Sequence, residues 1–103
     1  MVAVVNVREA RKTKEVSPAP DYHHSRAALR HTPETERVAA ALEALAAAQP
    51  YAIPAIENTI VRVIRARAHG NFPALRLYYS VDDQAVRLLR IEEYEERETS
   101  PDA

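Results

Sequence analysis

The chain has 103 residues, of which 47% are hydrophobic and 28% are charged, and it contains no cysteine. This length suits one small domain with a modest core, and the lack of cysteine excludes disulfides, thiolate nucleophiles and thiolate metal ligands. The formal net charge of −1 argues against a protein whose whole surface binds nucleic acid. No apolar run approaches the ~18 residues of a membrane helix. We therefore expect an unexported, cytoplasmic protein with no membrane partner.

The start of the chain changes character at residue 8. Residues 2–7, Val-Ala-Val-Val-Asn-Val, are rich in β-branched side chains and predict a first strand. Residues 8–22 then combine mixed charge with two prolines and few large apolar side chains, which predicts a mobile arm or loop that runs to residue 24. The expected organisation is residues 1–7 first strand, 8–24 arm or loop, 25–98 main part of a single domain, and 99–103 tail.

A helix is predicted at residues 33–48. Thr32 is suited to cap it, and Pro33 fits the first helical position, where its missing N–H costs nothing. Pro50 prevents continuation. The apolar face is expected to be carried by Val38, Leu42 and Leu45. Just upstream, residues 25–31 predict one or two further helical turns.

The second half of the chain predicts three strands, at residues 59–68, 74–81 and 85–91. The only glycine of the chain, Gly70, lies between the first two strands and indicates a tight turn. In the middle strand a period of two directs one set of side chains inward, and this pattern makes the strand central. That inward set is Leu75, Leu77, Tyr79 and Val81.

These elements predict an α+β domain with the order β-α(α)-β-β-β. Its sheet is expected to be antiparallel, with three or four strands, and one or two helices are expected to cover it. The predicted core consists of Val4, Leu42, Leu45, Val61, Val63, Leu77, Tyr79, Val81, Leu89 and Ile91.

The arginines on the predicted strands are the main chemical signal, because the sequence has no Gly-rich phosphate loop and no His pair at metal-ligand spacing. Period-two alternation places Arg65 and Arg67 on one face, and it places Arg76 with Tyr78 on one face of the central strand. If the hairpin register brings these groups together, the sheet presents a cationic patch with an aromatic ring beside it, which suits a phosphodiester backbone. The alternative is an ordinary solvent face, paired with Glu and Asp across the strands.

The order of these features resembles the RelE/ParE superfamily of toxins from bacterial type II toxin–antitoxin systems. In that family a basic strand and a turn lead into an Arg-Xaa-Xaa-Tyr strand, and an apolar strand follows. The resemblance covers about residues 26–97. The matching segments are Arg65-Ala-Arg67, Gly70-Asn-Phe, Arg76-Leu-Tyr-Tyr-Ser-Val-Asp82 and Val86-Arg-Leu-Leu-Arg-Ile91.

The resemblance implies a ribosome-dependent mRNA endoribonuclease that works without metal or cofactor and is neutralised by an antitoxin protein. Carried over onto this sequence, Arg76 would stabilise the phosphate and Tyr94 would stand for the terminal aromatic as the second catalytic residue. The implied RNA-binding residues are Arg65, Arg67 and Arg97, and Tyr78, which shares a strand face with Arg76, is predicted to join them.

The chain departs from the family at its acidic end. Residues 92–98 hold five Glu and one Arg, and such a segment repels RNA phosphates. Two alternatives therefore stay open: a non-catalytic protein-interaction module on the same fold, and a divergent gyrase-directed member. In the first, the Ala-rich stretch 39–48 either packs on the sheet or joins two copies as a homodimer.

Overall fold

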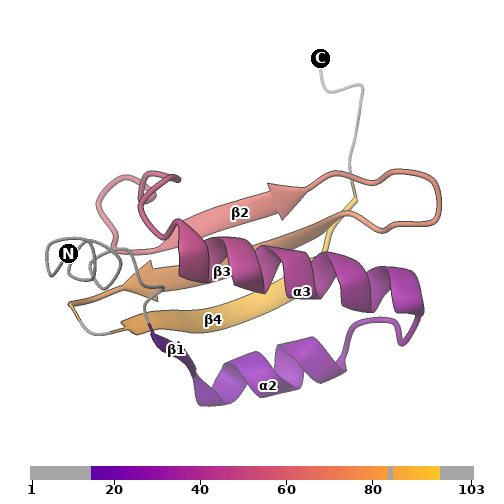
Figure 1. Ribbon diagram of the computed structural model, residues 1–103, viewed down its shortest axis with the longest axis horizontal. Helices are drawn as coiled ribbons and strands as arrows, with labels where there is room; N and C mark the ends of the chain where they lie inside the picture. Colours follow the sequence, from indigo (N-terminus) through magenta and orange to yellow (C-terminus); the bar gives the residue numbers. More distant parts are fainter. Residues whose placement is uncertain (1–14, 84, 96–103) are drawn as a thin grey trace, which may run out of the picture.

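The computed structural model describes residues 15–83 and 85–95, which form an α+β domain with two helices and a four-stranded sheet (Figure 1). The predicted α+β class is confirmed, and two helices precede the three strands of the second half, but the first strand of the structure is Glu15–Pro18, within the predicted arm. The predicted strand 2–7, the core position Val4, Arg97 and the tail 99–103 lie outside the described residues. The elements are β1 Glu15–Pro18, α2 Pro20–Ala27, α3 Pro33–Ala48, β2 Arg62–Ala66, β3 Leu75–Val81 and β4 Ala85–Glu93.

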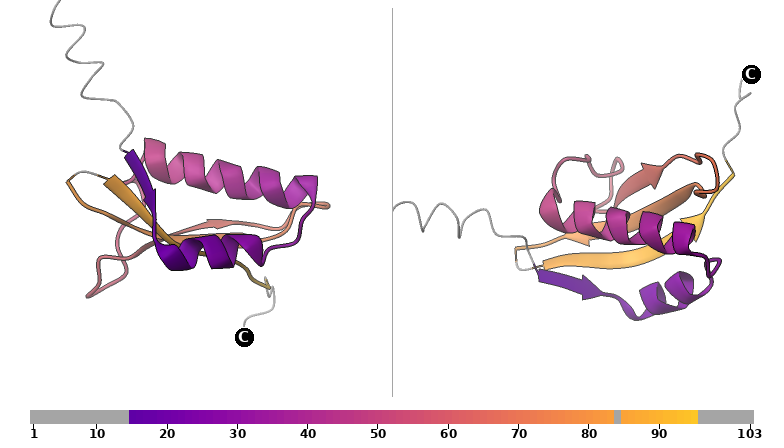
Figure 2. Two further views of the ribbon diagram at one scale, coloured as in Figure 1. Left: turned by 90° about the horizontal axis from the view of Figure 1, so that it is seen from below. Right: turned by 45° about the vertical axis from the view of Figure 1, so that its right-hand side comes forward.

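The sheet has the strand order β1-β4-β3-β2. The hairpins β2–β3 and β3–β4 are antiparallel, but β1 pairs with β4 in parallel, which corrects the prediction of a wholly antiparallel sheet. The chain leaves β1 at one edge, passes through both helices and enters β2 at the other edge. In both figures α3 lies along one face of the sheet, and α2 lies beside β4 at the edge (Figures 1 and 2).

The prediction of a loop or mobile arm over residues 8–24 is wrong for the part that the structure describes. The two prolines lie at the ends of regular elements there. Pro18 ends the edge strand β1 and Pro20 begins α2, and at both places a missing N–H is tolerated. Tertiary contacts hold both elements: the Ala19 N–H donates to the Leu88 carbonyl at 2.8 Å, and Tyr22 is 3% exposed.

Helix α3 has the predicted bounds and the predicted start. The Thr32 side-chain oxygen accepts a hydrogen bond from the Thr35 N–H at 3.1 Å, and Pro33 occupies the first turn. The helix ends just before Pro50. Side-chain ion pairs join it to α2, because Arg26 contacts Glu36 and Glu43, each at 3.0 Å.

Leu45 does not belong to the core, which corrects one predicted position. It is 44% exposed, whereas Ala39 and Ala46 are fully buried and Leu42 is 4% exposed. The buried face of α3 thus combines Leu42 with small side chains such as Ala39 and Ala46. Of the three large residues of the predicted apolar face, Leu42 is buried and Val38 packs against the core, so only Leu45 lies on the exposed side.

The middle strand has the predicted orientation, and Leu77 and Tyr79 are fully buried. The predicted core positions at and just before β2 are wrong, since Ile64 is buried and Val61 and Val63 are only half-buried. Three further core positions were predicted on β3 and β4. Ile91 is 1% exposed as predicted, whereas Val81 and Leu89 are half-buried. The register between β3 and β4 shifts at Tyr78/Tyr79, so the core takes Leu88 in place of Leu89.

Candidate functional site

The face of the sheet opposite α3 carries most of the predicted site residues, and no helix of residues 15–83 and 85–95 covers it (Figure 2). Cross-strand pairing arranges its side chains in two rows. One row is Val63, Tyr78 and Arg90, and the other is Arg65, Arg76 and Glu92. We call these six residues, together with Tyr94 just beyond β4, the open face.

The carboxylate of Glu92 is the centre of the open face. One of its oxygens, Oε2, accepts hydrogen bonds from the Arg76 Nε at 2.7 Å and from the Tyr78 hydroxyl at 3.1 Å. The other, Oε1, accepts from the Arg90 Nε at 3.0 Å. Donors from β3 and β4 thus converge on one anion, and the direct register of Arg76 with Glu92 dictates its position.

Two further contacts extend this cluster. The Arg76 guanidinium carbon lies 4.9 Å from the centroid of the Tyr94 ring, a cation–π distance. Tyr94 is held there by its own backbone, since its N–H donates to the Ala74 carbonyl at 3.1 Å. Arg65 on β2 is the direct cross-strand partner of Arg76, so two positively charged residues lie next to each other.

The pKa values of the cluster follow from these contacts. For Glu92, burial is the largest single influence and raises the pKa, but the hydrogen bonds from Arg90, Arg76 and Tyr78 together outweigh it, so that the pKa lies below its ordinary value. Burial, followed by the negative charge of Glu92 and the hydrogen bond to it, raises the pKa of Tyr78. At neutral pH Glu92 is therefore a carboxylate and Tyr78 a neutral donor.

These protonation states define the chemistry of the open face. Guanidinium groups and a neutral phenol are hydrogen-bond donors that bind phosphate oxygens. A carboxylate with a lowered pKa and three donors is a weak proton acceptor. The arrangement therefore suits the binding of an oxyanion and the stabilisation of negative charge.

The structure brings together four of the six predicted site residues. They are Arg65, Arg76, Tyr78 and Tyr94, and all four lie on the open face. The predicted cationic patch required the hairpin to bring Arg65 or Arg67 next to Arg76, and the register pairs Arg65 with Arg76. Arg67 lies one residue beyond β2 and is exposed. Arg97 lies outside the described residues.

Sequence reasoning missed the central residue, Glu92. It treated residues 92–98 as an acidic tail, whereas β4 continues to Glu93. The available signal was the period of two, because Arg90 and Glu92 are two residues apart and so project from the same face of a strand. The predicted alternative, arginines paired with acidic groups across the strands, is realised at Arg76 and Glu92.

A groove and a small cleft lie outside the Glu92 cluster, and the cleft is next to it. A groove of about 610 Å³ separates α3 from β1 and α2. Small apolar side chains of α3, including Ala40 and Ala44, line one wall. Its polar groups bind each other, since the Tyr22 hydroxyl donates to the Glu43 carboxylate and Arg26 contacts the same oxygen. Burial is the first cause of the raised pKa of Tyr22.

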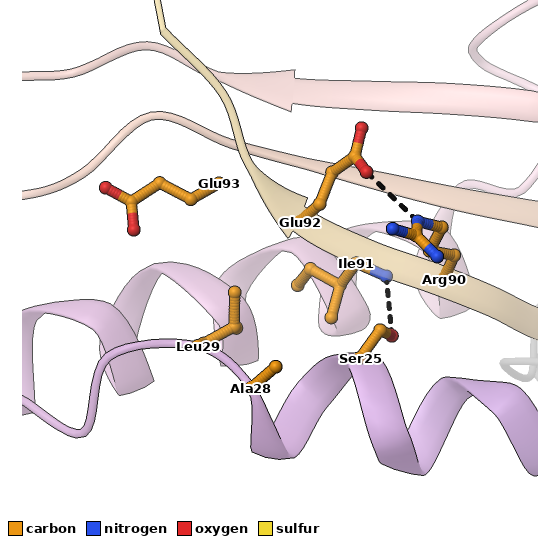
Figure 3. Close-up of a pocket in the computed structure, with 7 residues that line it drawn as sticks. All are labelled: Ser25, Ala28, Leu29, Arg90, Ile91, Glu92 and Glu93. Atoms are coloured by element: carbon orange, nitrogen blue, oxygen red, sulfur yellow. Dashed lines mark hydrogen bonds and ion pairs between the residues drawn. The ribbon is translucent and has the colours of Figure 1, made fainter.

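The cleft has a volume of about 150 Å³ and lies between the end of α2 and the edge of β4 (Figure 3). Ala28, Leu29 and Ile91 give it an apolar floor, and the Ile91 N–H donates to the Ser25 hydroxyl oxygen at 3.0 Å. Figure 3 shows Arg90 and Glu92 on the side of β4 away from α2. Both residues also line the cleft, so the cleft is continuous with the open face.

Within residues 15–83 and 85–95, no group of three or more His, Asp or Glu side chains is arranged to hold a metal ion. In the same part of the chain, no helix combines the length and apolar character needed to cross a bilayer. No protein-family model matches the sequence, and no curated protein matches it significantly. The function is therefore inferred from the geometry of the open face.

Proposed function

We propose that the chain is a toxin-type protein similar to the RelE/ParE superfamily, and that it acts in the cytoplasm as a metal-independent ribonuclease. One observation carries the proposal: Arg76 lies between Arg65 and Glu92, against the ring of Tyr94, on a sheet face that neither α2 nor α3 covers. This arrangement places positive charge and an aromatic ring within reach of one nucleotide. The order of strands, turn and arginines agrees with the same proposal.

In this proposal each side chain has a distinct role. Arg76 stabilises the negative charge that develops on the scissile phosphate. Arg65 and Arg67 position the RNA backbone, with Arg97 as a further basic residue, and Tyr78 and Tyr94 stack a base or donate a proton. The substrate is mRNA on the ribosome, and an antitoxin protein would neutralise the toxin.

The test is expression of the wild-type chain together with Arg76→Ala and a matched control. We expect the wild type to arrest growth and to cut mRNA on ribosomes, with cleavage mapped by primer extension. Loss of a transition-state contact costs about 100- to 1,000-fold in rate, so Arg76→Ala should relieve the arrest. Arg37→Ala removes the same charge from an exposed position on α3 and should leave both readouts unchanged.

A harmless wild type that cuts no mRNA would contradict the ribonuclease proposal. It would favour the second candidate, a non-catalytic interaction module on the same fold. The observation behind that candidate is that Arg76, Tyr78 and Arg90 each donate a hydrogen bond to Glu92 of the chain itself. A gyrase-directed activity would appear in the same experiment as growth arrest with intact mRNA.

A further inference from the structure

The position of Glu92 resembles that of a bound ligand more than that of an ordinary surface ion pair. A typical surface pair joins two long side chains in one of many geometries. Here a single carboxylate takes both its Arg76 and Tyr78 donors on one oxygen and the Arg90 donor on the other. The side chain of Glu92 is only 23% exposed, so it is largely shielded from water.

Within the two rows of the open face, the described side chains carry more positive than negative charge. Arg65, Arg76 and Arg90 bring three positive charges to the open face, and Glu92 supplies the one carboxylate in its two rows. A phosphate group offers more acceptor oxygens than a carboxylate and binds guanidinium groups with the same fork geometry. The same donors would therefore accept a phosphate in the place that Glu92 now fills.

We propose that Arg76, Tyr78 and Arg90 form an oxyanion site for an RNA phosphate, and that Glu92 occupies this site in the resting protein. RNA then binds only when the Glu92 side chain turns away from the strands. Because the carboxylate projects from β4 on a flexible side chain, its release needs rotamer changes and no movement of the sheet. This inference rests on the proposed function, since it takes RNA as the displacing ligand.

The experiment compares Glu92→Gln with the matched control Glu93→Gln. Both variants remove one negative charge from neighbouring residues, but Glu93 pairs with Arg30 at the edge of the sheet and contacts no donor of the oxyanion site. Binding is measured with inorganic pyrophosphate by calorimetry and with a labelled single-stranded oligouridine by fluorescence anisotropy. We expect Glu92→Gln to lower the Kd for both probes at least about tenfold, and Glu93→Gln to change it less than about twofold.

Equal changes in the two variants would overturn the inference, because they would reflect net charge alone. Unchanged or weaker binding by Glu92→Gln would overturn it as well. Glu92→Ala serves as a second variant, because it removes the acceptor that a glutamine oxygen still offers to Arg76. Circular dichroism establishes that each variant is folded.

The two probes separate this inference from the proposed function. Tighter pyrophosphate binding by Glu92→Gln, with no RNA binding by any variant, supports the oxyanion site and contradicts RNA as its ligand. Strong RNA binding by the wild type that is lost in Arg76→Ala but unchanged in Glu92→Gln supports the proposed function. That second result overturns the blocking role of Glu92.

Discussion

The two faces of the sheet are built from alternate residues of the same strands, yet they differ in almost every physical respect. Under α3, Leu75, Leu77 and Tyr79 are fully buried and Ile91 is 1% exposed. On the open face, the side chains of Arg76 and Arg90 are 32% and 62% exposed. One face is closed by apolar packing, and the other is held together by hydrogen bonds to one carboxylate.

This difference separates stability from function within one short segment. Burial of apolar side chains stabilises the fold, so the covered face should govern the free energy of unfolding. Ion pairs that remain partly in water contribute little to stability. The open face is thus able to hold charged groups for binding at small cost to the fold, and substitutions on the two faces should affect different measurements.

The largest expected effect of breaking the covered face is that of Leu77→Ala. This substitution leaves a cavity beneath α3 and should lower the free energy of unfolding by about 2 to 5 kcal/mol. Urea denaturation followed by circular dichroism measures it. The control is Leu45→Ala on the exposed side of α3, for which we expect about 0.5 kcal/mol or less. Equal losses in the two variants would contradict the assignment of the buried helix face.

Two neighbouring tyrosines sharpen the comparison, because they point to opposite faces. The Tyr79 hydroxyl is buried and donates to the Pro50 carbonyl at 2.9 Å, whereas the Tyr78 hydroxyl donates to Glu92 on the open face. Tyr79→Phe should cost about 0.5 to 1.5 kcal/mol, the usual net value of one hydrogen bond. Tyr78→Phe should cost about 0.5 kcal/mol or less, since water replaces its contact. A greater loss of stability in Tyr78→Phe would show that the open face also supports the fold.

The smallest expected effect is the pH dependence of stability contributed by Glu92. Its pKa in the folded state lies below the ordinary value of 4.5, so the folded protein binds this proton less readily than the unfolded chain does. The stabilisation is therefore complete above pH 4.5 and is lost as the pH falls through the lowered pKa. We expect less than about 1 kcal/mol, measured as the difference between wild type and Glu92→Gln in urea denaturation at neutral and acidic pH. An identical acid response in both proteins would show that Glu92 contributes nothing.

Local sequence signals determined much of the fold. The cap at Thr32, the proline at position 33 and the proline at position 50 predicted α3 correctly at both ends. The period of two in β3 predicted its buried side chains, and Gly70 predicted a turn, where it adopts a φ of 58°. These signals are local, because capping, proline geometry and side-chain alternation depend only on a few neighbouring residues.

Contacts between distant residues decided what the sequence alone did not. β1 and α2 contain few large apolar residues. They are ordered because β1 pairs with β4 and because Tyr22 of α2 is buried in the core. Because of the bulge at Tyr78/Tyr79, Leu88 and not Leu89 lies in the core. On α3, Ala39 and Ala46 are buried with Leu42, whereas Leu45 is exposed.

The open face likewise depends partly on local sequence and partly on tertiary structure. The sequence by itself determined that arginines and tyrosines alternate with apolar residues along the strands, because a strand sends neighbouring side chains to opposite faces. Only the strand register decided that Arg65 stands beside Arg76 and that Glu92 lies opposite it. Register is set by turns, bulges and packing across the whole sheet, so the partner of each charge was a property of the tertiary structure.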